Sequence, residues 1–152
     1  MIMAKQTLGT TIITQVGIVV QDIEAKARAW AEVLGLPVPE IMVTDAYERA
    51  QTEYNGKPSN ARAKLAFFSF GQVELELIEP IGERSTWQDQ LDQHGDSLHH
   101  IAFEVQGMSE RVAYLEAKGL SLVQRGKYPG GRYAYIDGNA QLGAILELLE
   151  ND

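Results

Sequence analysis

The feature that most constrains the fold is an internal repeat. The stretch "QVGIVVQDI" from Gln15 has a counterpart in "HIAFEVQGM" from His100, and "LELIE" from Leu75 has one in "LELLE" from Leu146. A repeat of this kind indicates two units that cannot each bury their own apolar face and that pack on one another. We expect one domain over residues 1–152, built from repeats at about 12–80 and 97–150.

Within each unit, the pattern of apolar residues predicts a strand, a helix and three further strands. The first helix is bounded by Asp22 as a cap and Gly35 as a stop, and the second helix ends at Gly119. The predicted strands cover residues 12–20, 40–44, 62–70, 73–79, 98–105, 120–124, 132–137 and 144–150. Consecutive strands without helices between them pair antiparallel, which excludes a doubly wound parallel sheet. The predicted class is α+β, either as two βαβββ modules or, if the repeat is coincidental, as a plain α+β domain.

Two segments lie outside this pattern. "STWQDQL" predicts a short connecting helix, because Ser85 and Gln88 stand at capping-box spacing. Residues 44–60 are polar and rich in turn formers, which predicts a long loop with at most one helical turn. A loop of that length in a compact domain is often functional.

Composition excludes several classes of partner. Thirteen basic and twenty-one acidic residues give a net charge of −8, whereas nucleic acids and anionic membranes require concentrated Lys and Arg. The absence of cysteine excludes disulfides and cysteine-based zinc or nucleophile sites. Residues 1–11 lack a secretory-signal pattern, and no apolar run is long enough to cross a bilayer. We therefore expect a cytoplasmic protein.

Four polar residues occupy equivalent places in the two units. The first strands supply Gln15 and His100, and the last strands supply Glu76 and Glu147. If the units pack about a pseudo-twofold axis, all four converge. Buried carboxylates then need a nearby cation or a raised pKa. One imidazole, two carboxylates and an amide oxygen suit one divalent ion of Zn, Mn, Co, Ni or Fe. The alternative is solvent-facing glutamates and a structural histidine.

Three segments, "GIVVQDIEAKARAWAEVLGL", "LHHIAFEVQGMSERVAYLEAKGL" and "GAILELLE", resemble the vicinal oxygen chelate superfamily, over nearly the whole chain. The resemblance implies a curved mixed sheet around a metal-binding cavity with the helices outside, and a homodimer. It places the metal ligands at Gln15, Glu76, His100 and Glu147, while His99 faces the other way. Family members chelate two neighbouring substrate oxygens and stabilise an enolate as a proton leaves carbon. In that chemistry Glu147 is the first choice of base and Glu76 the second.

The resemblance leaves the reaction open among isomerase, epimerase and lyase. "STWQDQLDQHGDSLHHIAFEV" is most similar to methylmalonyl-CoA epimerases, although Gln15 stands where those enzymes usually have a histidine. The ligand set is instead similar to that of some glyoxalase I enzymes, but Val19, Pro80 and Asp96 stand where those enzymes bind glutathione. A non-catalytic drug-binding protein of the same fold is the third possibility.

The stretch "RGKYPGGRYAY" supplies candidates for holding the rest of a substrate. Arg125, Lys127 and Arg132 flank a glycine-rich turn, where cations and backbone can bind a carboxylate or phosphate. Tyr133 and Tyr135 share one face of a strand and are expected to line the cavity. These residues suit a small molecule such as an acyl thioester or another anionic carbonyl compound. The alternative is an exposed basic hairpin with its tyrosines in the core.

Overall fold

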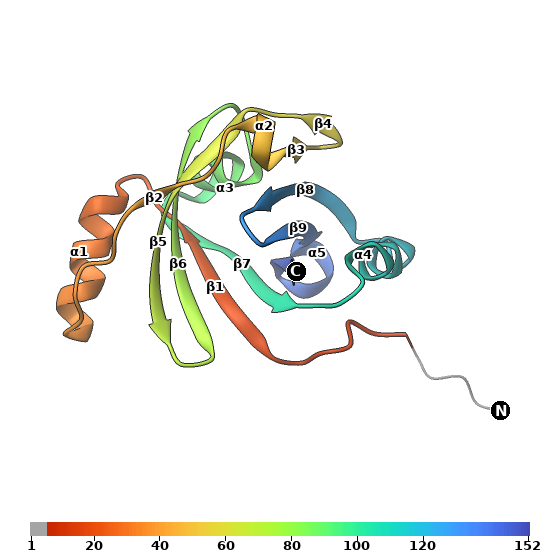
Figure 1. Cartoon of the computed structure of the whole chain (residues 1–152), viewed down its shortest axis with the longest axis horizontal. Coiled ribbons are helices and arrows are strands. Elements are labelled where there is room, and N and C mark those ends of the chain that lie inside the picture. The colour runs from red at the N-terminus through yellow and green to blue at the C-terminus, as the bar shows by residue number, and fades with distance from the viewer. Residues whose placement is uncertain (1–5) are drawn as a thin grey trace.

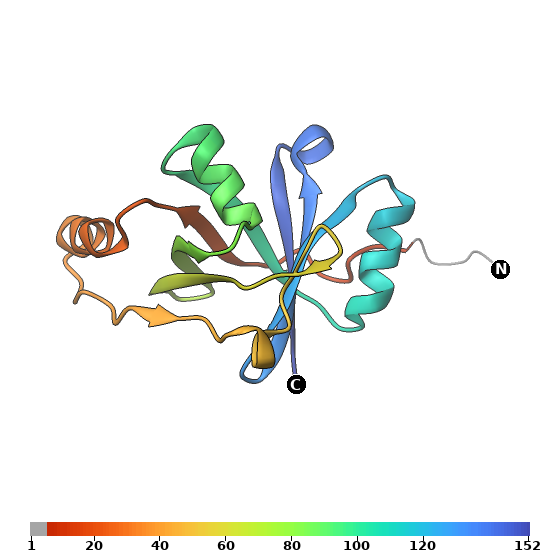
Figure 2. The same ribbon diagram turned by 90° about the horizontal axis from the view of Figure 1, so that it is seen from above.

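The structure, a computed structural model, describes residues 6–152. The N-terminal segment in which we found no secretory signal begins with residues 1–5, which lie outside the described residues. The strands form one curved, mixed sheet in the order β2-β5-β6-β1-β7-β10-β9-β8-β3-β4. Figures 1 and 2 show α1 and α4 on the outside of this sheet, on opposite sides of the molecule. The predicted α+β class, with a curved mixed sheet and outer helices, is confirmed.

Residues 13–82, called here the first half, form the strands from β1 at the centre of the sheet to β2 at one edge. β1 pairs in parallel with β6, β6 antiparallel with β5, and β5 antiparallel with the short edge strand β2. The first helix begins where Asp22 accepts a hydrogen bond from the Ala25 amide and ends at Gly35 in the left-handed region. The bounds are β1 Ile13–Val19, α1 Ile23–Leu34, β2 Met42–Val43, β5 Ala61–Phe70 and β6 Val73–Gly82.

Residues 97–151, called here the second half, pair in the same order. β7 is parallel to β10, β10 is antiparallel to β9, and β9 is antiparallel to β8. β1 and β7 join the halves as an antiparallel pair at the centre. β8 extends past its predicted end at Gln124. The bounds are β7 Ser97–Glu104, α4 Met108–Ala117, β8 Ser121–Tyr128, β9 Gly131–Gly138, α5 Asn139–Leu142 and β10 Ala144–Asn151.

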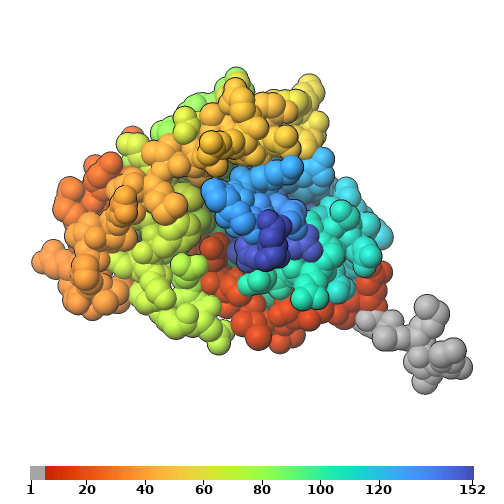
Figure 3. Space-filling model, in the orientation of Figure 1, coloured from red at the N-terminus to blue at the C-terminus, as the bar shows by residue number. Residues whose placement is uncertain are grey.

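Residues 44–60 are more ordered than the predicted loop. They form α2 (Tyr47–Ala50) and a hairpin of β3 (Glu53–Tyr54) and β4 (Lys57–Pro58). The hairpin turns at Asn55 and Gly56, both at positive φ, and Asn-Gly is a strong hairpin signal that we did not use. β3 pairs with β8 of the second half, so this segment crosses from one half to the other. Figure 3 shows its surface against that of β8.

The connection between the halves is the predicted helix, α3 (Thr86–His94). The Ser85 side chain accepts a hydrogen bond from the Gln88 amide at 3.1 Å, which caps the first turn. Within residues 6–152, no helix combines the length and apolar character that crossing a membrane requires.

The core divides between the two faces of the sheet. Leu75 and Leu77 pack with α1 residues in one cluster, and Leu146 and Leu148 pack with α4 residues in another. Because neighbouring strand residues point to opposite faces, the glutamate inside each Leu-Glu-Leu triplet faces away from the helices. A third cluster, which contains Trp87 and Tyr135, lies on that inner face.

Candidate metal centre and cavity

The strand register brings the four expected metal ligands onto one face of the sheet. Gly17 of β1 is paired with Glu76 of β6 and with His100 of β7. One step along, Gln15 is paired with Ala102, which is paired with Glu147 of β10. Positions two apart on a strand share a face. The four side chains therefore occupy two adjacent rows across β6, β1, β7 and β10.

His100 lies between Glu76 and Glu147 at a buried point, although the ligand atoms of the three side chains are not all within 4.8 Å of one another. The His100 Nε2 atom lies 3.3 Å from Glu76 Oε1 and 3.6 Å from Glu147 Oε1. His100 is 0% exposed, Glu76 7% and Glu147 3%. Within residues 6–152, none of these three atoms has a hydrogen-bond partner.

Such a cluster of partnerless polar atoms fits a cation. Buried polar groups are nearly always paired, and an unpaired buried charge costs several kcal/mol. One imidazole nitrogen and two carboxylate oxygens form a typical ligand set for a divalent transition metal. The amide of Gln15 lines the same cavity and is available as a fourth ligand. The residues present therefore fit the divalent ion inferred from the sequence.

The position of His100 depends on Gly17, which sequence reasoning did not single out. A β-carbon on Gly17 would lie 2.1 Å from His100 Cε1. The imidazole thus occupies the space that any other side chain at this strand position would take. A glycine inside a predicted strand signals such a close approach.

The protonation of the cluster is shifted from that of isolated side chains. Burial raises the pKa of the Glu147 carboxyl to about 7; the His100 charge opposes this rise, while the Glu76 charge adds to it. Burial lowers the pKa of the His100 imidazole, but Glu147 and Glu76 outweigh it, so its pKa is raised overall. The metal-free cluster therefore retains protons at a pH where isolated carboxyl groups have lost theirs.

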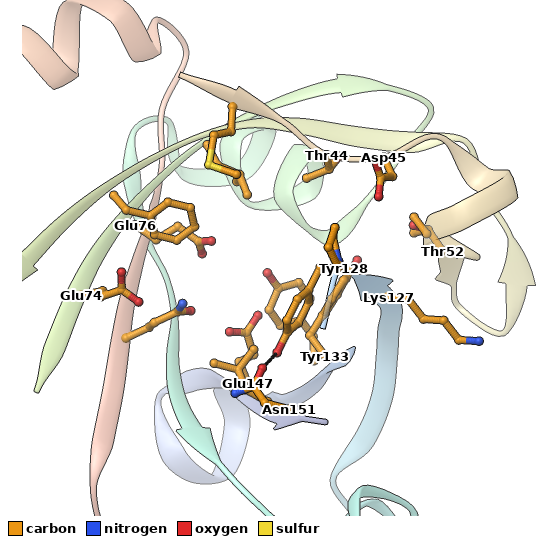
Figure 4. A pocket seen from close by; sticks show the side chains of 18 of the residues that line it. Thr44, Asp45, Thr52, Glu74, Glu76, Lys127, Tyr128, Tyr133, Glu147 and Asn151 are labelled. Atoms are coloured by element: carbon orange, nitrogen blue, oxygen red, sulfur yellow. Dashed lines mark hydrogen bonds between the residues drawn. The ribbon is translucent and has the colours of Figure 1, made fainter. Parts of the chain in front are cut away.

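The cluster lies at the inner end of a cavity of about 590 Å³, a size typical of small-molecule sites. Figure 4 shows Glu76 and Glu147 pointing into it from opposite sides, with Tyr133 beside Glu147. Thr44, Asp45 and Thr52 close the side opposite the sheet. The segment that crosses between the halves therefore forms one wall of the cavity.

Both candidate tyrosines line the cavity, and the hydroxyl of each accepts one hydrogen bond from a neighbouring side chain. Trp87 Nε1 donates to the Tyr135 hydroxyl at 3.0 Å, and Gln124 Nε2 donates to the Tyr133 hydroxyl at 3.1 Å. Burial raises the pKa of both phenols. Each hydroxyl therefore keeps its own proton, which it can donate to an oxygen in the cavity.

The three candidate cations are placed differently. Arg125 pairs with Glu53 of the crossing hairpin. Arg132 pairs with Glu150 and with Asp152. Lys127 lines the mouth of the cavity, and no described carboxylate lies within ion-pair distance of it. Of the three, only Lys127 is thus unpaired, and its exposed side chain points away from the two glutamates (Figure 4).

We expected His99 to point to the other face of the sheet, but it packs against the inner-face residue Tyr135 and contacts His100. The register between β1 and β7 shifts beside His100, and His99 lies at this irregularity. Its Nδ1 atom lies 2.9 Å from His100 Nδ1, and its Nε2 atom lies 3.1 Å from Thr86 Oγ1. Burial, together with the neighbouring His100, holds the pKa of His99 well below its ordinary value. Sequence reasoning singled out neither Thr86 nor Gln124, which accepts hydrogen bonds from Thr86.

A separate acidic group lies at the start of α1. Ligand atoms of Asp22, Glu24 and Glu79 lie within 4.8 Å of one another, but Asp22 and Glu24 are exposed. Glu79 accepts a hydrogen bond from the Ile23 amide, and Lys64 pairs with Glu24 and Glu79. These contacts cap the helix and offset part of the negative charge, and Asp22 and Glu24 are exposed to solvent, so the group needs no ion.

Comparison with known families and curated proteins gives two matches. Residues 14–135 match the family described as the Glyoxalase/Bleomycin resistance protein/Dioxygenase superfamily. An uncharacterised protein of Bacillus subtilis (strain 168), YqjC, is 35% identical over 94 residues. That alignment covers 59% of this chain and 66% of the relative, slightly under two thirds of its length.

Solved structures share the fold at low sequence identity. The hypothetical protein BH1468 from Bacillus halodurans C-125 is 21% identical, with a TM-score of 0.64 and coverage of 92% of this chain and 94% of that one. Methylmalonyl-CoA epimerase from Mycobacterium tuberculosis is 22% identical, with a TM-score of 0.62 and coverage of 99% and 93%. A Streptomyces coelicolor methylmalonyl-CoA epimerase variant in complex with 2-nitronate-propionyl-CoA is 22% identical, with a TM-score of 0.62 and coverage of 93% and 97%.

Proposed function

Because the chain belongs to the Glyoxalase/Bleomycin resistance protein/Dioxygenase superfamily, we propose that it is a divalent-metal-dependent enzyme that moves a proton on the carbon next to a carbonyl group. The observation that carries this proposal is that His100 Nε2 lies 3.3 Å from Glu76 Oε1 and 3.6 Å from Glu147 Oε1, that all three atoms are buried without a hydrogen-bond partner among the described residues, and that both glutamates line a cavity. Gln15, Glu76, His100 and Glu147 would hold the ion. When bound there, the ion supplies a Lewis acid for the negative charge that develops on a carbonyl oxygen.

Glu147 is the proposed base. Its carboxylate accepts the proton from carbon, and the electrons of the broken C–H bond pass toward the carbonyl oxygen. Without a metal ion, burial raises the pKa of the Glu147 carboxyl to about 7, so this buried carboxylate holds a proton more readily than an exposed glutamate does. Glu76 comes from a strand on the other side of the central β1–β7 pair. This arrangement suits epimerisation, in which a proton leaves one face of the carbon and returns to the other.

The proposed substrate is a small acyl thioester or another anionic carbonyl compound. Tyr133 and Tyr135 would donate hydrogen bonds to its oxygens from one wall. Lys127, with Arg132 directly opposite it on β9 and Arg125 two residues earlier on β8, would attract its anionic part. Support for this class comes from the resemblance to methylmalonyl-CoA epimerases and from the fold shared with them. A homodimer remains a prediction from the resemblance, and a cytoplasmic location remains a prediction from the sequence.

The second candidate is a glyoxalase I-like lactoylglutathione lyase. It is favoured by Gln15, which lines the cavity beside the two glutamates. The same proton transfer would then act on a hemithioacetal instead of an acyl thioester. A non-catalytic protein that binds small molecules is the remaining alternative, and it requires the cavity alone.

Two measurements test these proposals. Elemental analysis of protein purified without chelator should find one divalent ion per chain, and protein that cannot take up Zn²⁺, Mn²⁺, Co²⁺ or Ni²⁺ would favour the non-catalytic alternative. Solvent deuterium should then enter methylmalonyl-CoA in the presence of the loaded protein. A loaded protein that leaves methylmalonyl-CoA unlabelled but converts a glutathione hemithioacetal would replace the epimerase with the lyase.

A further inference from the structure

We propose that Gln124, Thr86 and His99 form a polar chain that fixes His100 in one tautomer, with its proton on Nδ1 and the lone pair of Nε2 directed at the metal centre. Gln124 and the two histidines are at most 2% exposed, and Thr86 is 7% exposed. The metal-binding part of this inference rests on the proposed function. The tautomer itself follows from hydrogen bonds within the chain.

The polar chain starts at the backbone amide of Thr86, which can only donate a hydrogen bond. The Thr86 N–H donates to the side-chain oxygen of Gln124 at 2.9 Å. An N–H group can only donate, so the Gln124 atom that faces it must be Oε1. The other end of the same amide, Nε2, then donates to the Tyr133 hydroxyl at 3.1 Å.

The direction of the next bond follows. Thr86 Oγ1 lies 3.1 Å from the same Gln124 Oε1 atom. An amide oxygen only accepts, so the Thr86 hydroxyl donates its single proton to it. The hydroxyl oxygen is then left as an acceptor. His99 Nε2 lies 3.1 Å from it and must donate, which puts the proton of His99 on Nε2.

The position of the proton on His99 determines the position of the proton on His100. A neutral imidazole carries one N–H, so with Nε2 protonated its Nδ1 atom is an acceptor. A charged His99 is disfavoured, because the ring is buried against His100 and the inner-face aromatic residue Tyr135. His100 Nδ1 lies 2.9 Å from His99 Nδ1 and must therefore donate to it. The Nε2 atom of neutral His100 is left bare, facing the two carboxylates.

The consequence is a link between a helix start and a metal ligand. Thr86 is the first residue of α3, directly after its cap at Ser85, so the chain begins at the first turn of this helix. Metal-binding histidines usually donate their other N–H to a fixed acceptor, and loss of that partner weakens metal binding about 10- to 100-fold. Here the acceptor is a second imidazole, whose own tautomer is set by Thr86. Thr86 and His99 are thus positioning residues, not ligands.

The test compares Thr86→Val with Thr86→Ser, which removes or keeps the hydroxyl at nearly constant size. In Thr86→Val, His99 Nε2 loses its acceptor, so the His99 proton is free to move to Nδ1 and drive the His100 proton to Nε2. We expect the Kd for Zn²⁺, measured by chelator competition, to rise about 10- to 100-fold in Thr86→Val and to stay near the wild-type value in Thr86→Ser. Circular dichroism checks that both variants fold.

A second readout needs neither a metal nor a variant. Two-bond ¹H–¹⁵N NMR spectra of the metal-free wild-type protein, with labelled histidine, should show neutral His99 protonated on Nε2 and neutral His100 protonated on Nδ1. The spectra must be recorded at a pH above the raised pKa of His100, where its ring is neutral. A neutral His100 with its proton on Nε2, or a wild-type Zn²⁺ affinity in a folded Thr86→Val variant, would overturn the inference. If the wild-type protein takes up no metal, the proposed function fails, and the spectra still decide the tautomer.

Discussion

The imidazole of His100 lies directly over Gly17, where a β-carbon would come within 2.1 Å of the ring atom Cε1. Gly17→Ala must therefore displace the ring or the strand. We expect it to destabilise the protein by about 1–3 kcal/mol, as overpacking does, and to lower the metal content per chain because Nε2 moves away from both carboxylates. Thermal unfolding and elemental analysis measure the two effects.

Gly126→Ala is the matched control for Gly17→Ala. A β-carbon on Gly126 would lie 2.8 Å from Tyr133 Cε1, so it crowds the same cavity without touching the ligand cluster. It should keep the wild-type metal content. If both variants lose the ion equally, general loosening of the cavity explains the loss and the specific role of Gly17 is wrong.

Replacing each glutamate by glutamine separates the base from the second carboxylate. The amide oxygen can still bind a metal, but it cannot accept a proton from carbon. We expect Glu147→Gln to lower the rate of deuterium exchange per bound metal about 10²- to 10⁴-fold, and Glu76→Gln to lower it less. The opposite order would transfer the role of base to Glu76.

The metal-free protein should lose stability as the pH rises. Glu147 has an ordinary pKa of 4.5 and a folded-state pKa of about 7, so the folded chain binds more protons than the unfolded chain between these values. The raised pKa of His100 acts in the same direction above about pH 6.5. The lowered pKa of His99 acts in the opposite direction below about pH 6.5. We therefore expect the Tm of chelator-treated protein to fall between about pH 6.5 and about pH 8, and Glu147→Gln to flatten this decline. A Tm that rises over the same range would contradict the assigned shifts.

Metal affinity should change with pH in the opposite sense. Binding requires deprotonated carboxylates and a free imidazole nitrogen, so metal uptake displaces the protons that the cluster holds. Isothermal titration in buffers of different ionisation enthalpy should detect proton release near pH 6, and affinity should increase toward about pH 7, the pKa of Glu147. If no protons are released on metal binding, the glutamates and His100 are already deprotonated in the metal-free protein, and the raised pKa values are wrong.

Lys127→Ala should weaken substrate binding more than Arg125→Ala does. Both residues lie on the same face of β8, but Arg125 already pairs with Glu53, whereas Lys127 lines the cavity mouth. An exposed ion pair contributes up to about 1 kcal/mol, so we expect KM for an anionic substrate to rise about fivefold in Lys127→Ala. Equal effects of the two substitutions would remove Lys127 from the binding site.

Local signals in the sequence were sufficient for most of the fold. Helix α1 begins and ends at the cap and stop residues, Asp22 and Gly35, because both act through bonds to the nearest turn. The placement of Glu76 and Glu147 opposite the helices needed only the alternation of a strand. These features depend on neighbours a few residues away, so a single sequence contains them.

Features that depend on distant pairing were missed. The two-residue strands of the crossing hairpin are too short to show alternation, and the partner of β3 lies about seventy residues away in β8. The pairing of Arg125 with Glu53 follows from that register and was equally hidden. Thr86 and Gln124 are ordinary polar residues in sequence, and their roles depend on a contact across 38 positions.

The four expected metal ligands lie on both sides of the boundary between β1 and β7. Gln15 and Glu76 come from the first half, and His100 and Glu147 come from the second. Neither half alone has more than one of the two carboxylates. Two fragments cut within the connection at α3 would therefore be separately inert, and any recovery of metal binding on mixing them would report the reassembly of β1 against β7. If the proposed site binds an ion, its metal content would therefore report whether β1 and β7 are paired.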